Sequence, residues 1–155
     1  YIVTGGAGFI GSNLVAALCA RGDEVVVVDR LRQGVKWRNL AKHPIAAIVP
    51  PEDLPDFLAK APPVKALFHM GAISATTETD GDLVARTNIA LPQMLWDWCA
   101  DAGVPFIYAS SAATYGDGSL GFEDDLHAEA LACRLGLFRT DAGASQAVFP
   151  HRTWE

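Results

Sequence analysis

The 155-residue sequence is short of basic residues and has no basic stripe. Twelve Lys and Arg stand against 18 Asp and Glu, which leaves a formal net charge of -6. Proteins that bind a phosphate backbone carry positive charge in a patch or stripe, whereas the basic residues of this acidic chain are scattered. We therefore expect no nucleic-acid partner.

Cysteine is scarce, and long apolar runs are missing. Cys19, Cys99 and Cys133 are odd in number and far apart, a pattern that indicates neither a disulfide framework nor a zinc site, so we predict no metal. No apolar run approaches the roughly 18 residues of a membrane span, and no charged segment precedes a signal-like stretch. We expect no membrane partner and a cytoplasmic location. Because the chain opens on an apolar run without Met, we also expect it to be a fragment.

Apolar residues are abundant and arranged in an alternating order. Half of the sequence is apolar and 19% is charged, which is typical of a globular domain of this length. Short apolar runs predict strands at residues 1–4, 25–28, 45–49, 64–69 and 104–109. Helical spacing predicts helices at residues 9–22, 52–60 and 82–102, the last kinked or split by Pro92, and residues 31–44 read as a loop with a short helical piece. This alternation predicts an α/β fold, a Rossmann-type doubly wound parallel sheet with helices on both faces.

The strongest motif is Thr-Gly-Gly-Ala-Gly-Phe-Ile-Gly at residues 4–11, between a predicted strand and a predicted helix. This is the position that a dinucleotide fingerprint requires. Gly5 or Gly6 would allow the tight turn, Gly8 would let the backbone approach a pyrophosphate, and Gly11 would let the helix pack closely. The alternative is a glycine-rich turn without a ligand. The helix itself is predicted from the spacing of Phe9, Ile10, Leu14, Ala17 and Leu18.

An acidic residue closes the second predicted strand. Asp29 lies 18 residues after Gly11, close to the usual spacing of the acid that holds the adenosine ribose, although a strand-end turn residue would look the same. Basic residues that could reach a ribose 2′-phosphate and favour NADP follow it: Arg30, Arg32, Lys36 and Arg38. A solvated basic loop is the alternative.

Two more segments end predicted strands, where ligands of doubly wound sheets bind. The first is His-Met-Gly-Ala-Ile-Ser at residues 69–74, whose small residues leave room for a flat coenzyme. The second is Tyr-Ala-Ser-Ser-Ala-Ala-Thr-Tyr-Gly at residues 108–116, which places hydroxyls at the same edge.

These four elements, in this order, resemble the extended short-chain dehydrogenase/reductase family, which includes the NAD-dependent epimerases and dehydratases. The resemblance covers about residues 1–125, and we assign residues 1–131 to an incomplete NAD(P)-binding domain. It implies an NADP or NAD cofactor, a nucleotide-sugar substrate, redox epimerisation through a carbonyl intermediate, and a homo-oligomeric parent. The coenzyme contacts that it implies are Gly5, Gly8, Phe9, Ile10, Gly11, Asp29, Arg30, Lys36, Met70, Gly71, Ala72, Ile73, Ser74 and Asn88.

The resemblance also implies a catalytic role for Ser111, whose hydroxyl would bond to the reacting sugar, with a capping serine as the alternative. The family often has Asn at the position of Arg30. Ala112 and Ala113 stand where a dehydratase would carry acids, which favours an epimerase over a dehydratase. The alternative is a different member of the extended family, either a UDP-sugar epimerase or a dehydratase.

The family's Tyr-x-x-x-Lys pair is absent from the sequence. The tyrosines are Tyr1, Tyr108 and Tyr115, the last lysine is Lys65, and Ser119 occupies the position four residues after Tyr115. A nearby lysine lowers the pKa of the family's tyrosine, so we predict that this chain is inactive alone. It would then be an inactive dinucleotide-binding fragment without a substrate domain. We predict that residues 132–155 are a frameshifted or degenerate tail.

Overall fold

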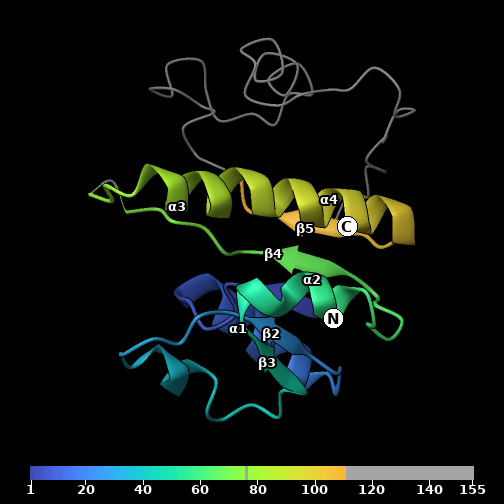
Figure 1. Cartoon of the computed structure of the whole chain (residues 1–155). Helices are drawn as coiled ribbons and strands as arrows, with labels where there is room; N and C mark the ends of the chain where they lie inside the picture. Colours follow the sequence, from blue (N-terminus) through green and yellow to red (C-terminus); the bar gives the residue numbers. More distant parts are fainter. Residues whose placement is uncertain (76, 111–155) are drawn as a thin grey trace, which may run out of the picture. The chain divides into compact units, whose positions relative to one another are not determined.

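The computed structural model describes residues 1–75 and 77–110. The predictions for Ser111, Tyr115 and residues 132–155 lie outside these residues. Five parallel strands form one sheet, in the spatial order β3-β2-β1-β4-β5 (Figure 1). They are β1 (Ile2–Thr4), β2 (Val26–Val28), β3 (Ala47–Val49), β4 (Leu67–His69) and β5 (Phe106–Tyr108). The order reverses at β1, which confirms the predicted doubly wound sheet and puts its switch point between β1 and β4.

The central strands are apolar on both faces because each face carries a core. Ile2 and Val28 belong to one cluster of buried residues, and Val3 and Val27 belong to the other. The register sets Thr4 beside Val28 on one side and His69 on the other. The carboxyl ends of three strands therefore meet at one edge.

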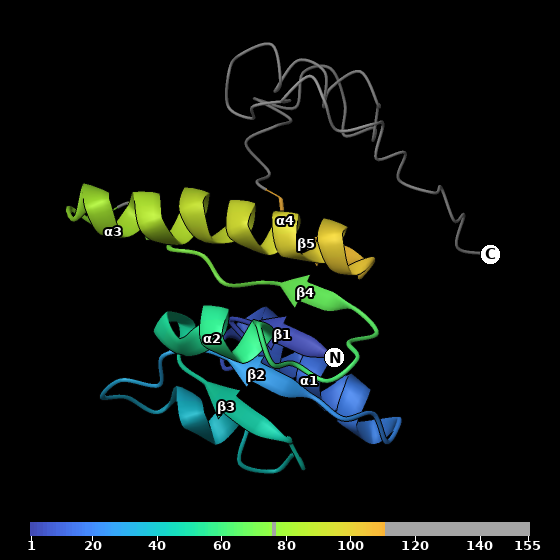
Figure 2. The same cartoon turned by 45° about the vertical axis from the view of Figure 1, so that its right-hand side comes forward.

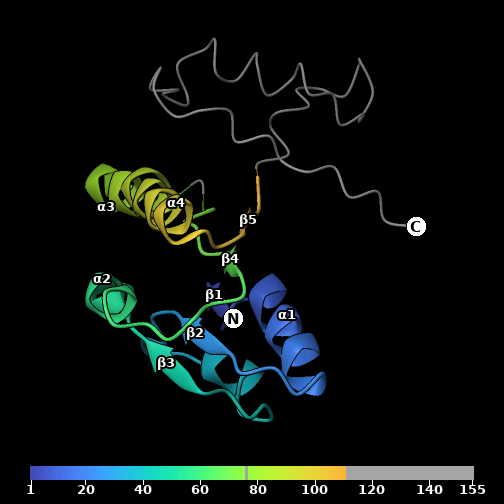
Figure 3. The same cartoon turned by 90° about the vertical axis from the view of Figure 1, so that its right-hand side faces the viewer.

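Helices cover both faces of the sheet. The helix α1 (Phe9–Ala20) lies on one side, and α2 (Leu54–Leu58) and α4 (Leu91–Ala102) lie on the other (Figures 2 and 3). Val15 and Leu18 of α1 pack in the core that contains Val3 and Val27, and Leu54 and Leu95 pack in the core that contains Ile2 and Val28. Two short 3-10 helices, η1 (Lys36–Asn39) and η2 (Pro51–Asp53), complete the connections around β3.

The helix predicted after the glycine cluster is α1, and its buried face begins at Gly11. Phe9 is 86% exposed and Ile10 is 63% exposed, whereas the buried residues are Gly11, Ser12, Val15 and Leu18. Glycine at position 11 has no side chain, so this face can approach the preceding turn most closely. The spacing of Phe9, Ile10 and Leu18 therefore predicted the helix correctly, and of these three residues only Leu18 lies on its buried face.

The predicted helix over residues 82–102 is continuous in path but changes its hydrogen bonding before Pro92. It consists of α3 (Gly81–Ala85), the π-helix η3 (Arg86–Ala90) and α4. The Leu91 N–H donates to the carbonyl of Arg86, five residues earlier. Proline has no N–H for the carbonyl of Asn88, so a wider turn at this point relieves the conflict that an α-helix would meet.

The described cysteines are free thiols. Cys19 is partly buried, and Cys99, a residue of α4, is buried in the core. Burial raises the pKa of Cys99 to about 11, which keeps its thiol protonated and unreactive. Within residues 1–75 and 77–110, no helix has both the length and the hydrophobicity needed to cross a membrane.

The packing of α4 on the sheet generates a stability prediction. Leu95 has 0% exposure, so Leu95→Ala removes buried methyl groups from the centre of a core. We expect it to lower the free energy of unfolding by about 2–5 kcal/mol in urea denaturation. Val35→Ala is the control, because Val35 is 64% exposed and its loss should change stability by less than about 0.5 kcal/mol. Equal effects of the two substitutions would contradict this packing.

Candidate functional site

The turn between β1 and α1 depends on a glycine in the left-handed region. Gly5 has φ +64°, and its N–H donates to the Val28 carbonyl at 2.8 Å. A Cβ atom on Gly5 would lie 2.7 Å from the backbone of Gly71. This position therefore needs glycine both for its conformation and for the close approach of the segment after β4.

The start of α1 lies directly on this turn. A Cβ atom on Gly11 would overlap the carbonyl oxygen of Gly5 and lie 2.8 Å from Cα of Gly6. On Gly6, a Cβ atom would lie 2.8 Å from the Val27 side chain. The turn is thus held between α1 on one side and β2 on the other.

The first turn of α1 presents unpaired backbone donors. The first hydrogen bond into the helix runs from the Ser12 N–H to the Gly8 carbonyl at 3.0 Å. The N–H groups of Phe9, Ile10 and Gly11 have no acceptor among the described residues. No side chain caps the helix and no acidic residue lies in its first turn. Free donors at the positive end of a helix dipole form a site for an anion.

Asp29 braces the glycine turn from the end of β2. Its Oδ2 accepts a hydrogen bond from the Ala7 N–H at 2.9 Å, and its Oδ1 pairs with Lys36 Nζ at 2.5 Å. The Asn39 side chain donates to the Ala7 carbonyl at 2.9 Å. Both backbone polar groups of Ala7 are therefore fixed by the connection from β2 to β3. Sequence reasoning missed Asn39, since an amide in a polar loop carries no distinguishing signal.

A buried pair ties β1 to β4 at the same edge. The Thr4 hydroxyl lies 2.7 Å from Nδ1 of His69 and accepts a hydrogen bond from the Gly71 N–H at 3.2 Å. Burial lowers the pKa of His69, so its ring is neutral at pH 7. Nδ1 then accepts the Thr4 proton, and we assign the ring proton to Nε2 from this network. The Met70 N–H also donates to the Thr4 carbonyl at 3.1 Å, which fixes the turn after β4.

The amide of Asn88 holds the segment that follows. Its Oδ1 accepts from the Ile73 N–H at 2.8 Å, and its Nδ2 donates to the Ile73 carbonyl at 2.9 Å. The resemblance implied that Asn88 contacts the coenzyme. In the structure this side chain from the π-helix acts on the backbone of Ile73, which positions the residues beside the glycine turn.

A hollow of about 460 Å³ opens at the same edge of the sheet, among segments that follow β2, β3 and β4. Arg30 and Glu52 lie in its wall as an ion pair, with Arg30 Nε 3.1 Å from Glu52 Oε2. The rest of the wall is mostly apolar, with Leu83, Leu91 and Met94 among its residues, and also contains Arg86 and Thr87. Sequence reasoning predicted Arg30 but missed the other residues, which come together only when the strands are ordered.

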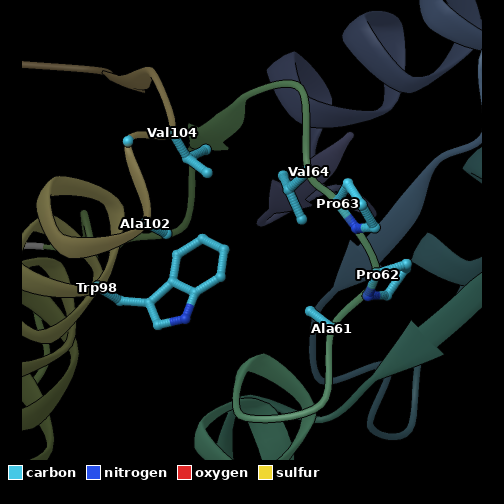
Figure 4. A pocket seen from close by; sticks show the side chains of 8 residues that line it. Ala61, Pro62, Pro63, Val64, Trp98, Ala102 and Val104 are labelled. Atoms are coloured by element: carbon cyan, nitrogen blue, oxygen red, sulfur yellow. The ribbon is translucent and has the colours of Figure 1, made fainter.

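A second hollow, of about 350 Å³, lies at the other end of the strands. Figure 4 shows the Trp98 ring facing the segment with Pro62 and Pro63, and Val64 and Val104 lie nearby. These residues precede β4 and β5, so they are remote from the glycine turn. The lining has no titratable side chain, and we assign it no role in the site.

The predicted residues that the structure describes gather at the carboxyl ends of β1, β2 and β4. The glycine turn, Asp29, Lys36 and residues 70–74 are joined there by the hydrogen bonds given above. Arg38 instead lies 5.6 Å from the ring of Trp37, and Arg32 has φ +49° in the exposed loop. Among the described residues, no three His, Cys, Asp or Glu side chains gather in a way that could hold a metal.

Comparison with known proteins agrees with this geometry. The family model for the NAD dependent epimerase/dehydratase family matches residues 1–134. The ADP-L-glycero-D-manno-heptose-6-epimerase of Fusobacterium nucleatum is 44% identical over 134 residues, which are 84% of this chain and 40% of that protein. The enzyme of the same name from Nitratidesulfovibrio vulgaris is 48% identical over 129 residues, 81% of this chain and 40% of that protein. The chain thus spans about 40% of the length of these curated relatives.

Solved structures share the fold. The Helicobacter pylori ADP-L-glycero-D-manno-heptose-6-epimerase matches with a TM-score of 0.64 and 28% identity, over 85% of this chain and 47% of that chain. A UDP-glucose 4-epimerase from Thermotoga maritima, solved with UDP-glucose, matches with a TM-score of 0.60 and 30% identity, over 75% of this chain and 39% of that chain.

The lowered pKa of His69 predicts a loss of stability in acid. Below pH 6.5, the ordinary pKa of histidine, the unfolded chain binds a proton at His69 that the folded chain does not bind. The free energy of unfolding therefore falls as the pH falls. His69→Asn keeps an acceptor for Thr4 and removes this titration. Between pH 6.5 and the lower pKa of the folded state, the wild type should lose up to about 1.4 kcal/mol per pH unit more than the variant. Parallel stability curves in denaturant titrations would refute the assignment.

The Asn88 contacts predict a local effect on hydrogen exchange. Asn88→Ala removes both partners of the Ile73 backbone, so exchange of the Ile73 amide should accelerate about tenfold or more, by loss of two hydrogen bonds. Asn13→Ala is the matched control, because Asn13 bonds to the Phe9 carbonyl instead. Exchange at Ile73 that is the same in both variants would show that Asn88 does not hold this segment.

Proposed function

Because the chain belongs to the NAD dependent epimerase/dehydratase family, we propose that it is the coenzyme-binding part of an ADP-L-glycero-D-manno-heptose-6-epimerase. The observation that carries the proposal is the set of free N–H groups at Phe9, Ile10 and Gly11, next to a turn braced by Asp29. The name of the enzyme comes from relatives that are 44% and 48% identical over the shared part.

The pyrophosphate of the coenzyme fits the start of α1. The free N–H groups of Phe9, Ile10 and Gly11 supply donors, and the helix dipole adds a favourable charge. At Gly8 the one neighbouring atom that a Cβ would meet is the Gly5 oxygen at 3.1 Å, so the backbone there is open to a close ligand. The exposed side chains of Phe9 and Ile10 lie at the same point, where the resemblance implies coenzyme contacts.

The adenosine fits between Asp29 and the hollow that contains Arg30. Each carboxylate oxygen of Asp29 can accept a second hydrogen bond beyond the one it makes, so ribose hydroxyls have acceptors. Lys36 keeps the carboxylate in place and offsets its charge. The apolar wall of the hollow, with Leu83 and Met94, suits an adenine ring.

The segment after β4 supplies the rest of the proposed coenzyme-binding surface. Gly71, Ala72 and Ser74 are small, and Asn88 fixes the backbone between them at Ile73. Nothing larger than a methyl or a hydroxymethyl group projects from these three positions, so a flat ring system can lie along the backbone. Met70 and Ile73 line the same segment.

In the intact parent, the bound coenzyme would remove a hydride from the sugar carbon and return it to the opposite face. The described residues would bind and orient the coenzyme for that step. Ser111 is proposed to donate a hydrogen bond to the reacting oxygen, and it lies outside the described residues. The nucleotide sugar is proposed from the names of the relatives, since the chain spans about 40% of their length.

A second candidate is a dinucleotide-binding module without catalysis. The observation that favours it is the absence of any Tyr-x-x-x-Lys within the 155 residues. The two candidates differ in turnover, so the chain and a full-length relative should be assayed side by side with the ADP-heptose substrate. Turnover by the chain would exclude the non-catalytic module. If the chain binds coenzyme without turnover, both candidates remain.

Calorimetric titration of the chain with NADPH and with NADH tests coenzyme binding. We expect a Kd on the order of micromolars, about -8 kcal/mol, for at least one of them. Flat titrations of a chain that is folded by circular dichroism would overturn the proposal.

Gly11→Ala should remove this binding. Its new Cβ would overlap the Gly5 carbonyl and push α1 away from the turn, so we expect Kd to rise at least about tenfold as the N–H groups are displaced. Gly34→Ala is the matched control, because a Cβ there meets nothing within 4 Å. Circular dichroism separates lost binding from lost folding, and wild-type affinity in Gly11→Ala would speak against the proposed pyrophosphate site.

A further inference from the structure

The ion pair between Arg30 and Glu52 stands where the coenzyme's adenosine ribose is proposed to bind. Arg30 directly follows Asp29 at the end of β2, and Glu52 belongs to η2, directly after β3. The two side chains bridge the ends of neighbouring strands with 3.1 Å between Nε and Oε2. Both also line the hollow of about 460 Å³.

Among the other basic side chains near this point, Lys36 and Arg38 are engaged elsewhere, and Arg86 lines the same hollow from the π-helix η3. Lys36 pairs with Asp29, so its charge offsets a carboxylate. Arg38 lies over the ring of Trp37 at 5.6 Å. Arg30 directly follows Asp29 in the sequence, whereas Arg86 lies on the helix after β4, so Arg30 is the cation that we expect to meet a phosphate on the 2′-oxygen of a ribose held by Asp29.

Glu52 changes what Arg30 can offer to that phosphate. The carboxylate occupies Nε of the guanidinium, and the terminal nitrogens make no hydrogen bond within the described part of the chain. Those nitrogens can still form a two-pronged contact with a phosphate. The pair has no net charge, however, so a phosphate that approaches Arg30 also approaches the negative charge of Glu52.

We propose that Glu52 determines the coenzyme selectivity of this site, by pairing with Arg30 and weakening the binding of a ribose 2′-phosphate relative to an unmodified ribose. The proposal rests on the coenzyme site of the preceding section and goes beyond it, because it assigns the selectivity to an acid on the β3 side of the hollow. Glu52 is 59% exposed and Arg30 is 39% exposed, so both can be reached from solvent and can rearrange.

The test compares NADPH with NADH in calorimetric titrations of the whole chain. Glu52→Gln keeps an oxygen that can accept from Arg30 Nε and removes the negative charge. We expect the ratio of the NADH Kd to the NADPH Kd to rise about three- to tenfold, the effect of one nearby charge at a partly exposed site. Arg30→Gln should lower the same ratio.

Asp53→Asn is the matched control, because it removes the same negative charge at the next position. The side chain of Asp53 is exposed and pairs with nothing in the described residues. A ratio that stays at the wild-type value in Glu52→Gln, or that rises equally in Asp53→Asn, would overturn the proposal. Failure of the wild type to bind either coenzyme would instead overturn the proposed function, and the two failures are thus distinct. Higher salt should reduce the effect of Glu52→Gln if the charge is its cause.

Discussion

The backbone contact between the turn after β1, the start of α1 and the segment after β4 is the constraint on which the site depends. At this contact main chain lies against main chain, because Gly5, Gly11 and Gly71 have no side chains to separate them. A Cβ atom on Gly5 would come within 2.7 Å of Gly71, and one on Gly11 would overlap the Gly5 carbonyl. The free N–H groups of α1 consequently lie at the switch point of the sheet, where a phosphate can reach them.

Polar side chains hold this contact in one arrangement. Asp29 and Asn39 fix the two polar groups of Ala7, and Thr4 connects the buried His69 to the Gly71 N–H. Each of these bonds satisfies a backbone or side-chain group that would otherwise be left without a partner near the core. The same bonds keep the donors of α1 available, since none of them uses the N–H groups of Phe9, Ile10 or Gly11. A binding surface that is already ordered loses less entropy when the ligand arrives.

The acids at this edge serve different purposes. Asp29 is 10% exposed and is fixed by a backbone donor and by Lys36, so it acts as a rigid part of the turn. Glu52 is 59% exposed and contacts the flexible side chain of Arg30, so its contribution depends on what else occupies the hollow. The mostly buried side chain of Asp29 therefore shapes the site, whereas the exposed Glu52 adjusts the charge of the site.

Local patterns in the sequence were sufficient to predict the succession of strands and helices along the chain, the glycine turn and the position of Asp29. Strand runs, glycine spacing and strand ends are each encoded within a few neighbouring residues. The π-helix before Pro92 and the exposed side chains of Phe9 and Ile10 were decided by hydrogen bonding and by the close packing at Gly11. Only the tertiary structure brought Asn39 to Ala7, His69 to Thr4, and Glu52 to Arg30, pairs that are 32, 65 and 22 residues apart. Such contacts follow from the order and register of the parallel strands, which bring distant strand ends to one edge and leave no local pattern in the chain.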